Sequence, residues 1–345
     1  MNTLPRIVNR RQFIRGLAGL GLGASGVCAG AAHRIARAAE PVTLALDWYP
    51  NANHAGLFLA QERGYFRAEG LTVDLYTPSD PTTVLQTVGA GQDDFGISYQ
   101  TDVLLARAQG VPVVSVAALV QHPLLGVMSL KKRGITRPRD LAGKTVGYPG
   151  IPSQEAFLAT MLETDGARIS DVTLINVGFN LVPAVISGRV DAVMGAYWTH
   201  ETILAEREGY EVALMRVEAW GVPDYYELVL VTNEDVIAAQ PGVIRALLSA
   251  TQRGYLDAIA EPDAALDALA KAYEGIDREV EERGLELLIP VWTDGGIRFG
   301  TQTRERWEAY ANWMKSRGLI PTDLDISKAF TTEFLPDAHG TPVAT

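Results

Sequence analysis

Cysteine is almost absent from this chain, since Cys28 is the single one among 345 residues. A lone cysteine forms neither an intramolecular disulfide nor a thiolate metal cluster. Histidine is scarce as well, with five residues, and none of them has the spacing of a metal site. The sequence therefore predicts no metal centre.

The usual signatures of catalysis are also missing. The chain contains no G-x-S-x-G, no H-E-x-x-H, no P-loop and no reactive cysteine. It offers no nucleophile next to a base in any recognisable pattern. We therefore expect no catalytic residue and no cofactor, which favours a binding protein over an enzyme.

Positive charge is in short supply. The chain has 30 Lys and Arg against 41 Asp and Glu, a formal net charge of −11. Binding to a nucleic-acid backbone requires a clustered basic surface. This balance therefore excludes nucleic acid as an expected partner.

The first 39 residues contain six arginines and no acidic residue. Residues 9–15 contain the pair Arg10-Arg11, a Gly- and Ala-rich apolar run follows, and Ala36-Arg37-Ala38 has the small residues of a cleavage site. This arrangement predicts a twin-arginine signal over residues 1–39, which exports a folded protein to the periplasm. The G-x-G-x-x-G at residues 21–26 follows no strand, so it indicates no dinucleotide site. Val27 is large for the position before a lipidated cysteine, and the pattern leaves lipidation of Cys28 open.

No apolar run after Glu40 is long enough to cross a bilayer. We expect no membrane insertion of the mature chain. Its length exceeds one ordinary core, so two lobes are the default. We predict one lobe from residues 40–128 and 232–345 and a second from residues 129–231, joined by strands because no polar linker appears.

A short internal repeat supports two similar halves. In the first copy, Gly91 and Asp94 precede an apolar strand that ends at Ser98-Tyr99. In the second, Gly188 and Asp191 precede a strand that ends at Tyr197-Trp198. Two copies about 100 residues apart predict α/β halves whose strand ends face one another, although so short a pattern also occurs by chance.

Residues 42–66 combine a strand, a polar and aromatic turn, and a helix. In α/β proteins, ligands bind beyond the carboxyl end of such a strand. Asn53 is the expected N-cap of this helix, and Ser153 is the expected N-cap of a helix over residues 154–164.

Aromatic residues gather at strand ends and turns, where we place the cleft: Trp48, Tyr99, Tyr197, Trp198, Tyr225 and Tyr226. Together they predict a stacking site for a flat ring, although each alone also suits a core or rim position. Glu227 heads a strand, and a carboxylate buried there would need a donor such as an aminopyrimidine ring. A surface glutamate at a strand start is the alternative.

Five segments resemble the NMT1/THI5-like family over about residues 42–260: LDWYPNANHAGLFLAQERGYFRAEGL, AGQDDFGISY, GVPVVSVAAL, LAGKTVGYPG and VISGRVDAVMGAYW. That family contains periplasmic substrate-binding proteins of ABC importers and a fungal enzyme that makes the thiamin pyrimidine. The resemblance implies the two-lobed α/β periplasmic-binding-protein fold (type II), with two crossover strands between the lobes.

The enzyme branch is distinguished by three chemical parts. Where that branch has a lysine for pyridoxal phosphate, this chain has Ser98, and where it has a histidine, this chain has Asp102. Its cysteine-rich iron motif is replaced by residues 221–227. The resemblance therefore favours a binder, closest to the formylaminopyrimidine type, over a pyridoxal-phosphate-dependent pyrimidine synthase. Binding of riboflavin, of another flat heterocycle, or of a sulfonate- or nitrate-type anion remains open, although an anion site would need more cations than Lys144 and Arg189.

We expect capture by closure, with the heterocycle stacked between Trp48 and Trp198 and read by Glu227. The implied partners are an ABC permease and its ATPase, and the protein is expected to be a monomer. The expected ligand-binding residues are Asp47, Trp48, Asn51, Asn53, His54, Ser98, Tyr99, Ser153, Tyr197, Trp198 and Glu227.

Overall fold

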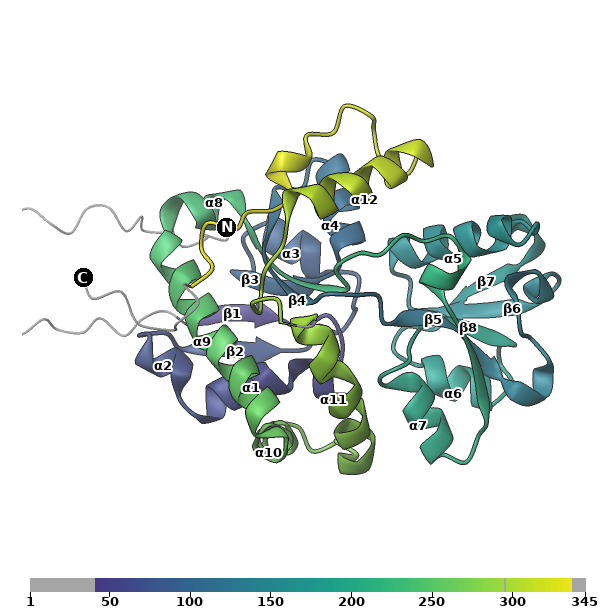
Figure 1. The fold of residues 1–345 in the computed structure, drawn as a ribbon, viewed down its shortest axis with the longest axis horizontal. Coiled ribbons are helices and arrows are strands. Elements are labelled where there is room, and N and C mark those ends of the chain that lie inside the picture. Colours follow the sequence, from purple (N-terminus) through teal and green to yellow (C-terminus); the bar gives the residue numbers. More distant parts are fainter. Residues whose placement is uncertain (1–40, 295, 337–345) are drawn as a thin grey trace, which may run out of the picture. The chain divides into compact units, whose positions relative to one another are not determined.

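The computed structural model describes residues 41–294 and 296–336. The predicted export signal and Cys28 lie outside these residues. The described residues belong to one compact unit, in which the strands form two five-stranded sheets (Figure 1).

The first sheet has the order β2-β1-β3-β10-β4. β1 is parallel to β2 and β3, whereas β10 is antiparallel to β3 and β4. Its strands are β1 (Val42–Ala45), β2 (Val73–Tyr76), β3 (Phe95–Ser98), β4 (Val113–Val120) and β10 (Leu228–Asn233).

The second sheet repeats this plan in the order β7-β6-β8-β5-β9. β6 is parallel to β7 and β8, and β5 is antiparallel to β8 and β9. Its strands are β5 (Leu125–Leu130), β6 (Thr145–Tyr148), β7 (Thr173–Asn176), β8 (Ala192–Tyr197) and β9 (Val212–Arg216). The two-lobed α/β fold predicted from the sequence is therefore confirmed.

The chain changes sheets twice within the described residues. A first connection, residues 121–124, leads from β4 to β5, and a second, residues 217–227, leads from β9 back to β10. Both lie before the boundaries proposed at residues 128 and 231, because β5 and β10 each belong whole to the sheet that they enter.

Helices cover both sheets (Figure 1). Those beside the second sheet are α5 (Pro152–Thr164), α6 (Leu181–Ile186) and α7 (Glu201–Arg207). Those beside the first are α1 (Ala55–Glu62), α2 (Tyr65–Ala68), α3 (Val84–Gly89), α4 (Gln100–Ala108), α8 (Glu234–Ala239), α9 (Pro241–Ala260), α10 (Pro262–Ala272), α11 (Arg278–Thr293) and α12 (Arg304–Ser316).

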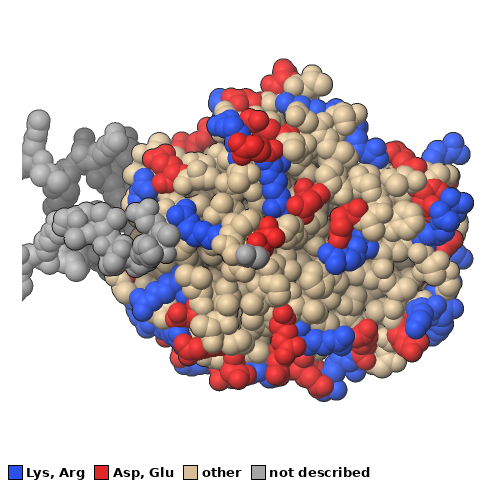
Figure 2. Space-filling model, viewed as in Figure 1, with Lys and Arg blue, Asp and Glu red and all other residues tan. Residues whose placement is uncertain are grey.

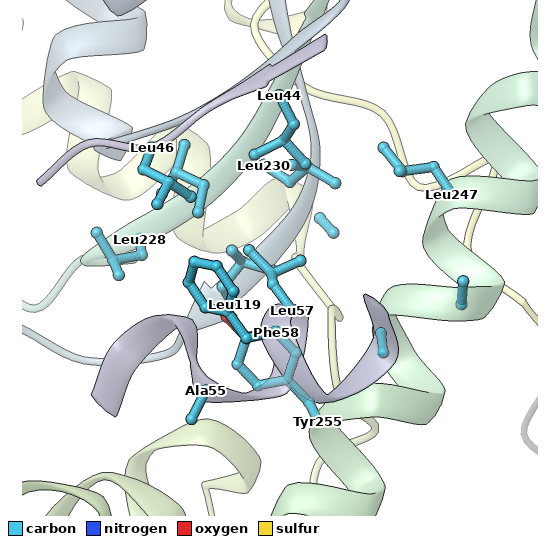
Figure 3. Packing of buried hydrophobic residues seen from close by; sticks show 14 of the residues in the cluster. Leu44, Leu46, Ala55, Leu57, Phe58, Leu119, Leu228, Leu230, Leu247 and Tyr255 are labelled. Carbon is cyan, nitrogen blue, oxygen red and sulfur yellow. The ribbon is translucent and has the colours of Figure 1, made fainter. Parts of the chain in front are cut away.

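Alternation along the strands distributes apolar side chains to both faces of the first sheet. Leu44 and Leu230 pack toward α1 and α9, where Leu57 and Tyr255 meet them (Figure 3). Val229 belongs to the core on the other face, with residues of α3, α4 and α12. The sheet is therefore buried on both sides, which fits its continuous apolar strands.

Two expected helix caps are wrong. Asn51, not Asn53, caps the 3-10 helix η1 (Ala52–His54), since Asn51 Oδ1 accepts from the backbone N–H of Asn53 at 2.9 Å. α5 begins at Pro152 with Ile151 at its N-cap position, so Ser153 already lies in the first turn. Proline suits the first helical position because its φ is fixed and its missing N–H would have no partner there.

Charged side chains of both signs are interspersed on the face of the protein that Figure 2 shows. None of the helices in the described part of the chain combines the length and apolar character needed to cross a membrane.

The contact between α1 and α9 requires glycine on both helices. A Cβ built on Gly254 would lie 2.2 Å from the carbonyl oxygen of Gly56, and one on Gly56 would lie 2.5 Å from the ring of Tyr255. A methyl group at position 254 must therefore push the two helices apart. By contrast, a Cβ on Gly242, also on α9, meets no atom within 4 Å.

We predict that Gly254→Ala lowers the free energy of unfolding by about 2 kcal/mol through overpacking, measured by urea denaturation. Gly242→Ala is the matched control, because it adds the same methyl group in open space, and should change stability by less than about 1 kcal/mol. Equal stabilities of the two variants would contradict the proposed close packing.

Candidate ligand-binding site

The loops that follow β1 and β3 meet those that follow β6 and β8 around a small cavity, here called the cleft cavity. Residues from both sheets contribute to it: Asp47, Trp48, Asn51, Tyr99, Ile151, Gln154, Gly195, Tyr197, His200 and Glu201. Its volume of about 20 Å³ has room for one water molecule. A larger molecule enters only if the surrounding side chains or the lobes move.

A second cavity, here called the side cavity, adjoins the first and has a volume of about 80 Å³. Asp47, Tyr99 and Ile151 line both cavities. The side cavity extends between α3 and α4, past Ser98 and Asp102.

Asp47 is the buried centre of a hydrogen-bond network. Its Oδ1 lies 3.0 Å from His54 Nε2, and its Oδ2 accepts from the Tyr99 hydroxyl at 3.0 Å. The backbone N–H of Asn51 donates to His54 Nδ1 at 3.2 Å, so Nε2 carries the proton that faces Asp47. Burial, followed by the charge of Asp47, raises the pKa of Tyr99 well above its usual value.

Trp48 presents its ring to the second lobe. The indole meets Phe179 edge-on, with 4.6 Å between ring centroids, and is only 8% exposed. Its Nε1 is buried and has no hydrogen-bond partner among the described residues. A donor buried without an acceptor costs free energy, and a ligand acceptor would recover it.

Trp198 does not line either cavity. Its Nε1 lies 3.4 Å from the carbonyl oxygen of Pro123 in the first connection, and the guanidinium of Arg216 lies 4.8 Å from its ring centroid. The structure therefore does not bring Trp48 and Trp198 together as the two sides of a stack, and Phe179 is the ring that faces Trp48.

Glu227 is fully buried and takes all its donors from the chain. Its Oε2 accepts from the backbone N–H of Leu124 at 2.7 Å and from the Tyr225 hydroxyl at 2.9 Å, and its Oε1 accepts from the Tyr197 hydroxyl at 3.1 Å. Glu227 thus joins the two connections and holds the ring of Tyr197 in the cleft cavity. Burial raises its pKa to about 7.

Some of the other predicted residues line one of the two cavities, and the rest support the loops around them. Asn51 and Tyr197 line the cleft cavity, and Ser98 lines the side cavity. Asn53 supports the turn, because its side-chain amide donates to Asn51 Oδ1 at 3.0 Å and its carbonyl accepts from Tyr255. The hydroxyl of Ser153 donates a hydrogen bond of 2.6 Å to Asp102 Oδ2 on the other lobe.

Five residues that line the cleft cavity were not among the predicted ones: Ile151, Gln154, Gly195, His200 and Glu201. Glu201 begins α7, its Oε2 accepts from the backbone N–H of Tyr197 at 2.8 Å, and burial raises its pKa to about 7. Gln154 has a buried Oε1 with no partner among the described residues. Gly195, at φ +98°, makes room for it, since a Cβ there would lie 2.2 Å from this oxygen. Their position one to four residues beyond predicted site residues was the available signal.

A second polar cluster crosses between the lobes at His200. Its Nε2 lies 3.1 Å from the Tyr49 hydroxyl, and its Nδ1 lies 3.5 Å from Glu281 Oε1 on α11. Burial lowers the pKa of His200 to about 4 and raises that of Glu281 to about 8. Both side chains are therefore favoured in their neutral forms at neutral pH.

The side chains that line the two cavities and can carry a charge near neutral pH are all acidic. Among the described residues that line them, Asp47, Asp102 and Glu201 are acidic and none is lysine or arginine. No group of three or more His, Cys, Asp or Glu in the described ranges is placed to hold a metal ion. The arrangement can accept hydrogen bonds from a neutral or cationic ligand, and it repels an anion.

Comparison with known proteins identifies relatives of this chain. The family model described as "NMT1/THI5 like" matches residues 51–265. The formylaminopyrimidine-binding protein of Halalkalibacterium halodurans is 40% identical, over 86% of this chain and 91% of its own. The 4-amino-5-hydroxymethyl-2-methylpyrimidine phosphate synthase of Aspergillus parasiticus is 29% identical, over 86% of this chain and 87% of its own. Binding proteins and synthases thus both occur among the relatives.

The structure is also similar to that of a solved binding protein. The alkanesulfonate-binding protein SsuA of Xanthomonas axonopodis pv. citri, bound to MOPS, aligns with a TM-score of 0.68, over 85% of this chain and 99% of its own. The two are 17% identical, so this likeness concerns the fold.

The raised pKa of Glu227 predicts a pH-dependent stability. A carboxyl group with a pKa of about 7 in the folded protein, against an ordinary value of 4.5, contributes stability that is lost as the pH rises through 7. We expect the free energy of unfolding of the wild type, relative to Glu227→Gln, to fall by about 2 kcal/mol between pH 5 and pH 7. Urea denaturation at each pH measures this difference, and parallel curves would show that Glu227 does not titrate in this range.

Proposed function

Because this chain belongs to the NMT1/THI5-like family, we propose that it is the solute-binding protein of an ABC importer and holds a formylaminopyrimidine-like heterocycle between its two lobes. The protein would act in the periplasm, bind its ligand as a monomer, and deliver it to a permease and its ATPase. The relative at 40% identity is named for binding this ligand.

The observation that carries the proposal is the set of polar atoms in the cleft cavity that lack partners. Trp48 Nε1 is a buried donor, and Gln154 Oε1 is a buried acceptor. Glu201 adds a carboxyl group beside them. An aminopyrimidine has ring nitrogens that accept and amino N–H groups that donate, which complements both kinds of atom.

Glu201 suits this role better than Glu227. Glu227 lies behind Tyr197 with three donors from the chain, whereas Glu201 receives the Tyr197 N–H on one oxygen and lines the cleft cavity itself. With a pKa of about 7, Glu201 can accept from an amino group when ionised and donate to a ring nitrogen when protonated.

The small size of the cleft cavity supports a mechanism in which the lobes move. At about 20 Å³ it is far smaller than the few hundred Å³ of usual ligand sites. The lobes would separate about the two connections, admit the ring against Trp48, and close over it. Closure would then present the surface that the permease binds.

Two alternative functions fit the residues of the site less well. A sulfonate or nitrate would face the carboxylates of Asp47 and Glu201, with no lysine or arginine among the described lining residues. A synthase that uses pyridoxal phosphate needs a lysine for its aldehyde, and the family resemblance implies that this chain has Ser98 in the place of that lysine.

We predict that Glu201→Gln weakens binding of synthetic formylaminopyrimidine by about 2 kcal/mol or more, because it removes a charge-assisted hydrogen bond. Isothermal titration calorimetry measures the affinity. Glu208→Gln is the matched control, since Glu208 lies at the end of the same helix and is exposed, and it should leave the affinity unchanged.

The same titration with riboflavin and with MOPS separates the alternatives. Tight binding of either one, without binding of formylaminopyrimidine, would contradict the proposal. So would an absorbance band of bound pyridoxal phosphate in the purified protein.

Export is a separate proposal with its own test. The pair Arg10-Arg11 supports the twin-arginine pathway, in which the pair itself is read. Replacing both residues with lysine should retain the protein in the cytoplasm on cell fractionation, whereas unchanged periplasmic recovery would rule out this route.

A further inference from the structure

Asp102 makes a contact between the lobes that the proposed binding mechanism does not use. It lies in the first turn of α4 on the first lobe and is only 6% exposed. Its Oδ2 accepts from the Ser153 hydroxyl at 2.6 Å, and its Oδ1 accepts from the Ser153 backbone N–H at 3.3 Å. Ser153 belongs to the first turn of α5 on the second lobe.

The bond from the Ser153 N–H is a helix cap supplied by the opposite lobe, and the bond from the Ser153 hydroxyl reinforces it. The N-cap residue of α5, Ile151, has an apolar side chain and makes no capping bond. The first N–H groups of a helix lack partners within it and favour a negative charge nearby. Asp102 therefore does for α5 what an N-cap aspartate does within one segment.

We propose that Asp102 is a closure latch: it caps α5 only when the lobes are together, and so couples lobe closure to the placement of Gln154 in the cleft cavity. Gln154 follows Ser153 directly, and its unpartnered Oε1 lies over Gly195. Asp102 is thus a positioning residue, which acts through α5. The inference depends on the proposed function only for the separation of the lobes, and not for the identity of the ligand.

The groups that form the latch can bind either each other or water. When the lobes separate, water replaces Asp102 at the exposed N–H groups of α5 and also solvates the carboxylate. When they close, burial costs the carboxylate its hydration, but the carboxylate keeps the N–H and hydroxyl of Ser153 from being buried without an acceptor. The balance is therefore small enough for a ligand to shift.

Protonation of Asp102 changes this balance. Burial raises its pKa to about 6, although the hydrogen bonds from Ser153 lower it. The titratable groups whose pKa values respond to its charge are Tyr99, beside it at the start of α4, and Tyr310 on α12, both phenols that stay neutral. Because the closed form holds the proton more tightly than a solvated carboxylate does, closure is favoured as the pH falls through about 6 and is weakened above it.

The experiment measures the distance between the lobes without any ligand. Nitroxide labels at Gln92→Cys on the first lobe and Arg189→Cys on the second, both exposed positions, are introduced into the full chain with Cys28→Ser. Pulsed electron paramagnetic resonance then gives the populations of short and long distances. Asp102→Ala should lower the ratio of short to long distances about tenfold at pH 7.5, because the N–H and hydroxyl of Ser153 would then be buried without an acceptor in the closed form.

Two further variants complete the test. Ser153→Ala, which keeps the backbone N–H, should shift the ratio in the same direction but less. Asp93→Asn is the matched control, because Asp93 is a buried carboxylate that accepts from Tyr76 at 2.7 Å within the first lobe. It should leave the distances unchanged, and circular dichroism checks that each variant is folded.

The proton dependence is measured against Asp102→Asn, which keeps an acceptor but does not titrate. His200, Glu201, Glu227 and Glu281 also titrate near the cleft, so the readout is the difference between wild type and Asp102→Asn. Between pH 7.5 and pH 5, the wild type should gain short distances relative to this variant. Identical pH profiles would overturn the proton dependence.

Unchanged distances in both Asp102→Ala and Ser153→Ala would overturn the latch itself. These measurements do not test the proposed ligand, because they are made without any ligand. Distances that shift as expected in a protein that does not bind formylaminopyrimidine would support the latch and contradict the proposed function.

Discussion

One buried carboxylate, Asp47, organises the site. It lies two residues after the end of β1 and fixes His54 and Tyr99 by hydrogen bonds of 3.0 Å each. The turn between β1 and η1 is thereby held against the end of β3, and Trp48, the next residue, is held at the second lobe. The negative charge of Asp47 also contributes to the raised pKa values of Tyr197, Glu201, Glu227 and Tyr255. In such a surrounding a further negative charge is costly, which favours ligands that donate hydrogen bonds.

The internal repeat explains why the site lies where it does. Asp94 Oδ2 accepts from the first residues of β1 through the N–H of Thr43 at 2.9 Å, and Asp191 Oδ2 accepts from Thr145 of β6 at 3.0 Å. An equivalent aspartate therefore joins the equivalent pair of strands in each sheet by a hydrogen bond. Because the two sheets have matching strand orders, matching strand ends come from both lobes to the cleft.

Local signals in the sequence predict this structure best. Apolar strands bounded by glycine and aspartate are visible in the chain itself, so the two-lobed α/β fold was predicted correctly. Trp48 and Tyr197, which were expected at strand ends, line the cleft cavity. The direction in which a side chain points is harder to predict, because it depends on which side of the backbone the residue faces. The side chains of neighbouring residues in an extended segment point to opposite sides. Tyr197 therefore lines the cleft cavity, whereas Trp198 points away from it toward the carbonyl oxygen of Pro123. Glu227 looked unpaired because one of its donors, the N–H of Leu124, lies 103 residues away.

The account's central claim is that an aminopyrimidine ring lies between the lobes and takes up the unpartnered atoms of the cleft. A crystal structure of the protein with formylaminopyrimidine tests this most directly. The account predicts the ring against Trp48, with a ring nitrogen in hydrogen-bond reach of the indole Nε1 and an amino group at Glu201 or Gln154. A ligand found elsewhere, or one that leaves these three side chains untouched, would contradict it.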